Sequence, residues 1–224
     1  MKTIAIIPAR GGSKRLHNKN LLPLGGIPLL AHSILFAKEH HEIIDAVYVS
    51  TDDETIKGVA LEYGAIVINR PAHLSGDNEP TLSALQHALE TIGDDVDTVI
   101  LLQPTNPLRE KNLLREAYQI FQFDYFNTLF TVTRNKDKLG RIIDAKFVPY
   151  NYTIGQRSQD LEPLYFENGL LYIIRARTIR SGYIVSDKAF PFIVDHPFSK
   201  VDIDTKDDFD YAEYLYLKHQ ENKK

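Results

Sequence analysis

The sequence predicts an α/β fold in which helices cover both faces of a mainly parallel sheet. Short runs of apolar and β-branched residues alternate with longer segments whose apolar residues recur at helical spacing. Prolines, glycines and capping residues separate the two kinds of segment. Because crossover helices join parallel strands in such an alternation, we expect three layers, α/β/α.

The expected elements follow one another from the N-terminus. Strands are predicted at residues 3–7, 47–50, 65–68, 98–102 and 128–133, and helices at residues 28–40, 54–63, 81–91, 111–123 and 207–217. Thr51 and Glu54 have the spacing of a capping box, which predicts that Thr51 caps the second helix. Gly64 and Gly93 stand where two of the helices should end. Residues 135–165 show neither period, and we expect them to be irregular.

Composition narrows the class of protein. A chain of 224 residues with a 43% hydrophobic share is enough for one sizeable domain, which we expect to span residues 1–224. There is no cysteine, which excludes disulfides, thiolate metal sites and a cysteine nucleophile. No signal peptide opens the chain, so a cytoplasmic protein is expected. No apolar run approaches the roughly 18 residues that span a membrane, and a net charge of −4 does not indicate a nucleic-acid partner.

A glycine-rich basic loop follows the first predicted strand. Pro8 ends the strand because it has no N–H, and the run PARGGSKRLHNKN extends from there to Asn20. The loop combines two glycines, which let backbone N–H groups approach a ligand, with four cations. Ligands of open α/β sheets sit beyond the carboxyl ends of the strands, so the loop predicts a phosphate cradle. A solvated basic turn is the alternative. The Walker and GxGxxG patterns are both absent, which argues against a P-loop kinase and an ordinary dehydrogenase.

Polar loops follow two further strands. Residues 70–77 are too polar and too long for a minimal connector, although Asp77 could simply cap an excursion. The run QPTNPLR, residues 103–109, is held by two prolines, and the amide of Gln103 can donate and accept, which suits hydroxyl recognition. A rigid turn before a helix start at Glu110 explains the prolines but not Gln103.

A pair of carboxylates stands near the end of the chain. Asp202 and Asp204 are two residues apart, which places them on one face of an extended segment. Paired carboxylates suit Mg²⁺, which takes one or two protein carboxylates together with phosphate oxygens and water. The alternative is that Asp204 or Thr205 caps the terminal helix.

Taken together, these motifs resemble those of the CMP-sugar synthetases, and specifically of the N-acylneuraminate cytidylyltransferases. The resemblance extends from about residue 3 to about residue 215 and includes the cradle, QPTNPLR, QRSQD at 156–160, FENGLLYI at 166–173 and DID at 202–204. It implies a Rossmann-like nucleotidyltransferase fold and the transfer of CMP from CTP to a nine-carbon acidic sugar. It also implies Mg²⁺ as cofactor and a homodimer, with no nucleic-acid or membrane partner.

The resemblance assigns roles to individual residues. The expected nucleotide-binding residues are Ala9, Arg10, Gly11, Gly12, Ser13, Lys19, Asn20, Arg70 and Thr81, with Ser83 a weaker candidate. The expected sugar-binding residues are Gln103, Gln156 and Arg157, with Lys136 or Lys138 assisting. Asp202 and Asp204 are expected to be the metal ligands, and they join Arg10 and Lys19 as the catalytic residues.

Residues 135–165 form, in that family, a projecting dimerisation element that reaches the partner's active site. Phe147, Tyr150 and Tyr152 would suit such an interface if they are exposed. Two departures from the family pattern stand out. Asn106 replaces the serine of QPTSPLR, and Phe166 and Glu167 stand where some members carry another arginine, which leaves the exact sugar open. A Kdo-type or other sugar nucleotidyltransferase, a metal-dependent glycosyltransferase and a non-catalytic nucleotide-binding module are the alternatives.

Overall fold

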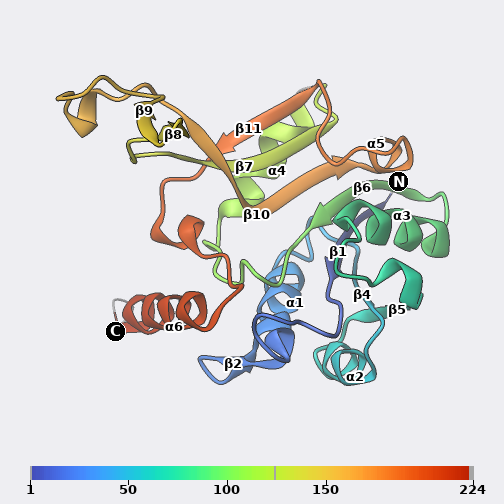
Figure 1. Cartoon of the computed structure of the whole chain (residues 1–224). Helices are drawn as coiled ribbons and strands as arrows, with labels where there is room; N and C mark the ends of the chain where they lie inside the picture. The colour runs from blue at the N-terminus through green and yellow to red at the C-terminus, as the bar shows by residue number, and fades with distance from the viewer. Residues whose placement is uncertain (1, 124, 222–224) are drawn as a thin grey trace.

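A seven-stranded sheet forms the centre of the computed structural model, which describes residues 2–123 and 125–221 (Figure 1). Its strand order is β11-β7-β10-β6-β1-β4-β5. These strands are β1 (Lys2–Pro8), β4 (Ala46–Thr51), β5 (Ile66–Asn69), β6 (Val96–Leu101), β7 (Thr128–Arg134), β10 (Tyr165–Arg175) and β11 (Ala189–Ile193). β10 runs antiparallel to β6 and β7, and the other neighbours are parallel. The prediction of a mainly parallel sheet is confirmed.

Helices cover both faces of the sheet, as the alternation predicted. They are α1 (Leu29–Glu39), α2 (Glu54–Glu62), α3 (Thr81–Ile92), α4 (Leu113–Phe123), α5 (Ala176–Arg180) and α6 (Lys206–Glu221). Side chains of β1 alternate between the faces: Ala5 and Ile7 pack with α1, α2 and α4, whereas Ile4 and Ile6 pack with α3 and α5. The result is a three-layer α/β/α domain.

α6 packs outside these layers on a third apolar cluster. The cluster joins Phe209, Ala212 and Leu215 of α6 to Leu108 of the QPTNPLR loop and to Val201. The segment before α6 is thereby held against the loop after β6. Short 3₁₀ helices lie at Lys19–Leu21, Ala72–Leu74, Ser158–Asp160 and Pro197–Lys200.

The predicted cap of α2 is wrong. Thr51 is the last residue of β4, and the helix is capped by Asp53. The Asp53 carboxylate accepts hydrogen bonds from the N–H groups of Thr55 and Ile56 at 2.8 and 2.9 Å. β4 extends to Thr51, one residue further than expected, so Thr51 still belongs to the strand. The capping position is taken by Asp53, which directly precedes Glu54. Gly64 and Gly93 end their helices with positive φ, as predicted.

Residues 135–165 are more regular than expected. β8 (Gly140–Ile143) and β9 (Lys146–Pro149) pair as an antiparallel hairpin, which projects away from the sheet (Figure 1). Asp144 and Ala145 form its two-residue turn with φ of 49° and 60°. The hairpin escaped prediction because such turns usually contain glycine. Another hairpin, β2 (Pro23–Leu24) with β3 (Ile27–Pro28), follows the cradle.

Candidate active site

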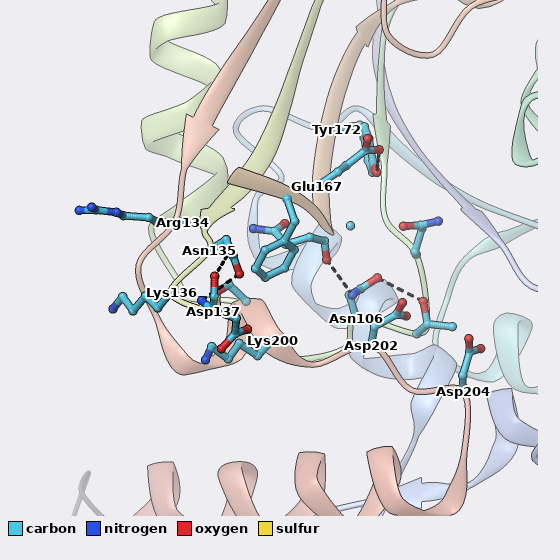
Figure 2. Close-up of a pocket in the computed structure, with 16 residues that line it drawn as sticks. Asn106, Arg134, Asn135, Lys136, Asp137, Glu167, Tyr172, Lys200, Asp202 and Asp204 are labelled. Carbon is cyan, nitrogen blue, oxygen red and sulfur yellow. Dashed lines mark hydrogen bonds between the residues drawn. The ribbon is translucent and has the colours of Figure 1, made fainter. Parts of the chain in front are cut away.

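Two cavities meet at the carboxyl ends of β1 and β6, where both share Gln103 and Thr105 in their walls. The inner cavity, of about 180 Å³, is lined by Pro8, Arg10, Ser13, Lys19, Asn20, Arg70, Glu79, Pro80, Thr81, Gln103, Pro104 and Thr105. The outer cavity, of about 700 Å³, is lined by residues of the QPTNPLR loop, the end of β7, β10 and residues 199–204 (Figure 2). One site is therefore built from segments that are far apart in the sequence.

The inner cavity gathers most of the predicted nucleotide-binding side chains. Arg10, Ser13, Lys19 and Asn20 come from the cradle loop, while Arg70 and Thr81 come from the connection between β5 and α3. The loop is fastened at three points: Ala9 N–H donates to the Ser50 carbonyl at 3.0 Å, Gly11 N–H to Asp52 at 3.0 Å, and the Asn20 amide to the Arg10 carbonyl at 3.1 Å. Ala9, Gly11 and Gly12 belong to this loop without lining the cavity.

Carboxylates neutralise the cations of the cradle. Asp77 forms ion pairs with Arg10, at 2.6 Å, and with Lys14. Asp204 pairs with Lys19 and Arg15, each at 2.8 Å. Hydrogen bonds from Lys14 and then Arg10 hold the pKa of Asp77 below its usual value. Because the Asp77 pairs are solvent-exposed, an incoming anion can displace them at low cost.

Arg70 differs from these cations because it is buried and two of its guanidinium nitrogens have no hydrogen-bond partner among the described residues. The residue is 8% exposed, and its Nε and Nη2 donate no hydrogen bond within the described chain. Burial lowers the pKa of Arg70, and nearby Asp52 only partly opposes the shift. Buried donors without acceptors are costly, so a cavity wall of this kind indicates a ligand that supplies them.

Arg109 provides the contrast, because it is equally buried but fully bonded. It donates to the Leu170 carbonyl at 2.7 Å, to Ser33 Oγ at 3.0 Å and to the Gln103 carbonyl at 3.0 Å. Burial lowers its pKa to about 9. Arg109 therefore fixes the loop that carries Gln103 rather than offering donors to a ligand.

The two aspartates of the DID motif line the outer cavity together (Figure 2). Burial is the main cause that raises the pKa of Asp202, and the charge of Asp204 adds to it, while the Thr105 hydroxyl and Lys19 act in the opposite direction. This concentration of negative charge fits a divalent cation, and oxygen donors are the ligands that Mg²⁺ prefers. No group of three or more histidine, aspartate or glutamate side chains is arranged for a metal within the described ranges.

Thr205, not Asp204, caps α6. Its Oγ1 accepts from Asp208 N–H at 3.3 Å, and the Asp208 carboxylate accepts in return from the Thr205 N–H at 2.8 Å. These reciprocal bonds are a capping box with aspartate as the second member. The carboxylate of Asp204 is consequently free of the cap and faces Lys19 and Arg15.

The predicted sugar-binding residues divide between the cavity and the projecting segment. Gln103 and Lys136 line the outer cavity, whereas Gln156, Arg157 and Lys138 do not. Arg157 pairs with Asp160 at 2.8 Å with 71% of its side chain exposed. Gln156 is occupied by bonds to Thr153 N–H and to the Asp160 carbonyl. Within one chain, therefore, the segment around Arg157 lies outside both cavities.

A tyrosine and a glutamate on β10 were missed by sequence reasoning. Tyr172 donates a short hydrogen bond to Glu167, and both line the outer cavity. Burial, followed by this bond, raises the pKa of Tyr172. Residues five apart on a regular strand point to opposite faces, but the register of β10 against β7 shifts between Glu167 and Tyr172. The irregularity that brings them together contains Gly169 with a φ of 74°, and a glycine inside a strand is the one signal that could have indicated it. Arg134, Asn135, Ser199 and Lys200 were also missed.

A cationic loop after β1 and a pair of carboxylates meet at one edge of an α/β sheet, which is the arrangement expected of a nucleotidyltransferase. The chain belongs to the cytidylyltransferase family, whose family model, described as Cytidylyltransferase, matches residues 4–223. The family indicated by the sequence motifs is thus confirmed.

Named relatives support this assignment over the whole chain. The pseudaminic acid cytidylyltransferase of Campylobacter jejuni subsp. jejuni is 34% identical over 233 residues, covering 99% of both chains. The CMP-N,N'-diacetyllegionaminic acid synthase of Legionella pneumophila subsp. pneumophila is 33% identical, again covering 99% of both. The N-acylneuraminate cytidylyltransferase of Streptococcus agalactiae is 32% identical over all of this chain but only 56% of its own length.

Solved structures share the fold at lower identity. A CMP:2-keto-3-deoxy-manno-octonic acid synthetase complexed with CTP superposes with a TM-score of 0.71 at 18% identity, covering 98% of this chain and 100% of its own. A 4-diphosphocytidyl-2C-methyl-D-erythritol synthase from Anaerococcus prevotii gives a TM-score of 0.65 at 16% identity, covering 96% of each chain. The Rossmann-like nucleotidyltransferase fold is confirmed. None of the helices in the described ranges combines the length and apolarity needed to cross a membrane.

Proposed function

We propose that the protein activates a nine-carbon acidic sugar, an N-acylneuraminate or a relative such as legionaminic acid, by transferring CMP from CTP. The anomeric hydroxyl oxygen attacks the α-phosphorus, the bond from this phosphorus to the bridging oxygen breaks, and pyrophosphate leaves while the hydroxyl proton is released. The observation that carries the proposal is the junction of the two cavities at Gln103, because it places a cationic cradle beside a larger polar cavity.

The inner cavity is proposed to hold CTP. Arg10, Ser13, Lys19 and Asn20 bind the triphosphate, together with the backbone of Ala9, Gly11 and Gly12. Arg70 is assigned to the base because cytosine offers a carbonyl oxygen and a ring nitrogen as acceptors for its unpaired donors, with Thr81 beside it. These side chains orient the triphosphate and neutralise the charge that develops during transfer.

Asp202 and Asp204 are proposed to hold Mg²⁺ at the junction. When bound, the ion supplies positive charge to phosphate oxygens. Asp204 also holds Lys19 and Arg15 at the mouth of the cradle, so the same carboxylate organises two cations of this chain. Gln103, which lines both cavities, is assigned to the sugar hydroxyls.

A homodimer is proposed through the β8–β9 hairpin. Ile142, Phe147 and Tyr150 are 72%, 52% and 59% exposed, an apolar surface that is unusual on an isolated hairpin. Tyr152 contributes less than the sequence suggested, because it is half-buried under the ammonium of Lys138. Arg157 projects with this segment, so we assign it to the carboxylate of the sugar bound by the partner subunit, through its bidentate fork.

Pyrophosphate release tests the proposal. The protein is incubated with Mg²⁺, with CTP, UTP, ATP or GTP, and with N-acetylneuraminic, legionaminic, pseudaminic or Kdo acid. We expect release with CTP and one of the nine-carbon acids, and loss of release in Asp202→Asn. Preference for Kdo would replace the sugar assignment. In a separate incubation with a CMP-sugar, consumption of that CMP-sugar without release of pyrophosphate would indicate a glycosyltransferase. Binding of CTP without any turnover would indicate a non-catalytic module.

A further inference from the structure

We infer that Asn106 is the positioning residue that sets the carboxylate pair Asp202 and Asp204 against Gln103, an inference that rests on the proposed metal role of that pair. Asn106 is 1% exposed, and both its amide nitrogen and its amide oxygen form hydrogen bonds. Its Nδ2 donates to the Asn168 carbonyl at 3.0 Å and to the Val201 carbonyl at 2.7 Å, and its Oδ1 accepts from Thr105 Oγ1 at 3.1 Å. One side chain thus joins the loop after β6, the irregular part of β10 and the segment before α6.

The bond to Val201 acts directly on the aspartates. Val201 directly precedes Asp202. On the other side of Asp202, the N–H of Ile203 donates to the Thr105 carbonyl at 2.8 Å. Val201 and Ile203 are 1% and 0% exposed in the cluster beneath α6. Alternation in an extended segment then turns Asp202 and Asp204 away from this cluster, into the outer cavity (Figure 2). The two bonds fix where along the loop the carboxylates stand.

The space beside the Asn106 side chain fits only glycine at position 169. A Cβ at Gly169 would lie 2.8 Å from both Asn106 Oδ1 and Gln103 Oε1, and Gly169 has a φ of 74°. Glycine therefore lets the amides of Asn106 and Gln103 pack side by side against β10. Gln103, which is assigned to the sugar, and Asn106, which positions the carboxylates, therefore both pack against Gly169.

Serine at position 106 would offer one hydrogen to donate where the asparagine amide offers two. A hydroxyl has one hydrogen to donate, so it can satisfy only one of the two carbonyls that Asn106 Nδ2 bonds. The other carbonyl would remain buried and unpaired, which favours local movement of residues 201–204. This chain is therefore expected to depend on asparagine at position 106.

The test uses Asn106→Ser, which replaces an amide with two hydrogens to donate by a hydroxyl with one. Binding of Mn²⁺ is measured by electron paramagnetic resonance in the presence of CTP, and the Mg²⁺ concentration for half-maximal pyrophosphate release is measured separately. We expect both constants to weaken by about tenfold, roughly one lost hydrogen bond, while CTP affinity without metal changes little. Backbone hydrogen exchange should rise in residues 201–204 and not in α3.

Asn151→Ser is the matched control. Asn151 is 4% exposed and also bridges backbone groups, donating to the Asp137 carbonyl at 3.0 Å and accepting from Leu139 N–H at 2.8 Å. We expect it to lose similar stability with unchanged metal constants. Equal metal shifts in both variants, or unchanged Mn²⁺ binding in folded Asn106→Ser, would overturn the inference.

Asn106→Leu is the second variant, because it keeps the size of the side chain without adding charge. It can donate to neither the Asn168 nor the Val201 carbonyl, so metal binding should weaken at least as much as in Asn106→Ser. Near-normal Mn²⁺ binding in folded Asn106→Leu would show that donation is not what matters. Because Mn²⁺ binding needs no sugar, this result stands even if wild type releases no pyrophosphate with any acid, the outcome that removes only the proposed function.

Discussion

Arg10 Nη1 donates to Asp77 Oδ1 at 2.6 Å, so the cradle carries its own counter-ion. Asp77 holds Lys14 as well, so a phosphate has to compete with this carboxylate for both cations. We expect Asp77→Asn to lower the KM for CTP by about two- to fivefold, a modest effect because exposed pairs are weak. Steady-state kinetics at saturating sugar measure it. A raised KM would mean that Asp77 organises the cradle instead of competing for it.

Arg70→Met should stabilise the protein while weakening CTP binding. Two buried nitrogens without acceptors are costly in the free protein, so replacing Arg70 by an apolar side chain should raise the free energy of unfolding by about 1 kcal/mol. Urea denaturation and CTP calorimetry measure the two effects. Arg109→Met is the control: it removes three satisfied hydrogen bonds and should destabilise. If Arg70→Met destabilised as strongly, Arg70 would be a structural residue.

Asp202→Asn and Asp204→Asn should each raise the Mg²⁺ requirement. Asparagine keeps an oxygen ligand but removes a negative charge, so turnover should fall by at least about tenfold and recover partly at high Mg²⁺. Thr205→Ala separates this effect from the helix cap, because it should cost about 1 kcal/mol of stability without altering metal dependence. Superimposable Mg²⁺ titrations for wild type and the two aspartate variants would remove the metal assignment.

Arg157→Ala and Asp202→Asn should complement each other when coexpressed. If Arg157 completes the partner's site, a mixed dimer contains one site with both residues intact. At limiting Mg²⁺, random mixing then restores about one quarter of wild-type turnover, more than either variant shows alone. No recovery, with mixed dimers verified by mass spectrometry, would mean that Arg157 does not act across the interface.

Arg157→Lys should raise the KM for the sugar far more than the KM for CTP, since lysine lacks the two-pronged donor geometry of the guanidinium.

His32 should make the fold sensitive to mild acid. Burial lowers its pKa from 6.5, outweighing the bond between Nε2 and the Leu24 carbonyl. The unfolded chain therefore takes up the proton first, and stability falls as the pH drops from 6.5 toward the folded-state pKa. His32→Gln, which can still donate to Leu24, should flatten this part of the stability profile. Parallel profiles for the two proteins would assign the acid sensitivity elsewhere.

The parts of the fold with a regular period were predictable from the sequence, whereas irregular pairings were not. Helical spacing placed α1, α3 and α4 to within about two residues. β10 went unpredicted because it joins β6 and β7 by long-range antiparallel pairing. In the site, the cradle directly follows β1 and the DID motif is a local pair of carboxylates, so both were visible in sequence. Asp77 reaches the cradle through a long-range contact, and the Glu167–Tyr172 pair depends on the geometry of the irregularity within β10, which local propensity does not specify.

The position of β10 has a consequence for synthesis of the chain. β10 fills the space between β6 and β7, yet it follows both in the sequence. Until residues 165–175 leave the ribosome, one edge of β6 has no partner strand. β7 cannot take its native place either, because its neighbour on that side is β10. Both strands are apolar and rich in β-branched residues, the composition that favours edge-to-edge association. Nascent chains that end before β10 should therefore be the species most prone to aggregate and to recruit chaperones.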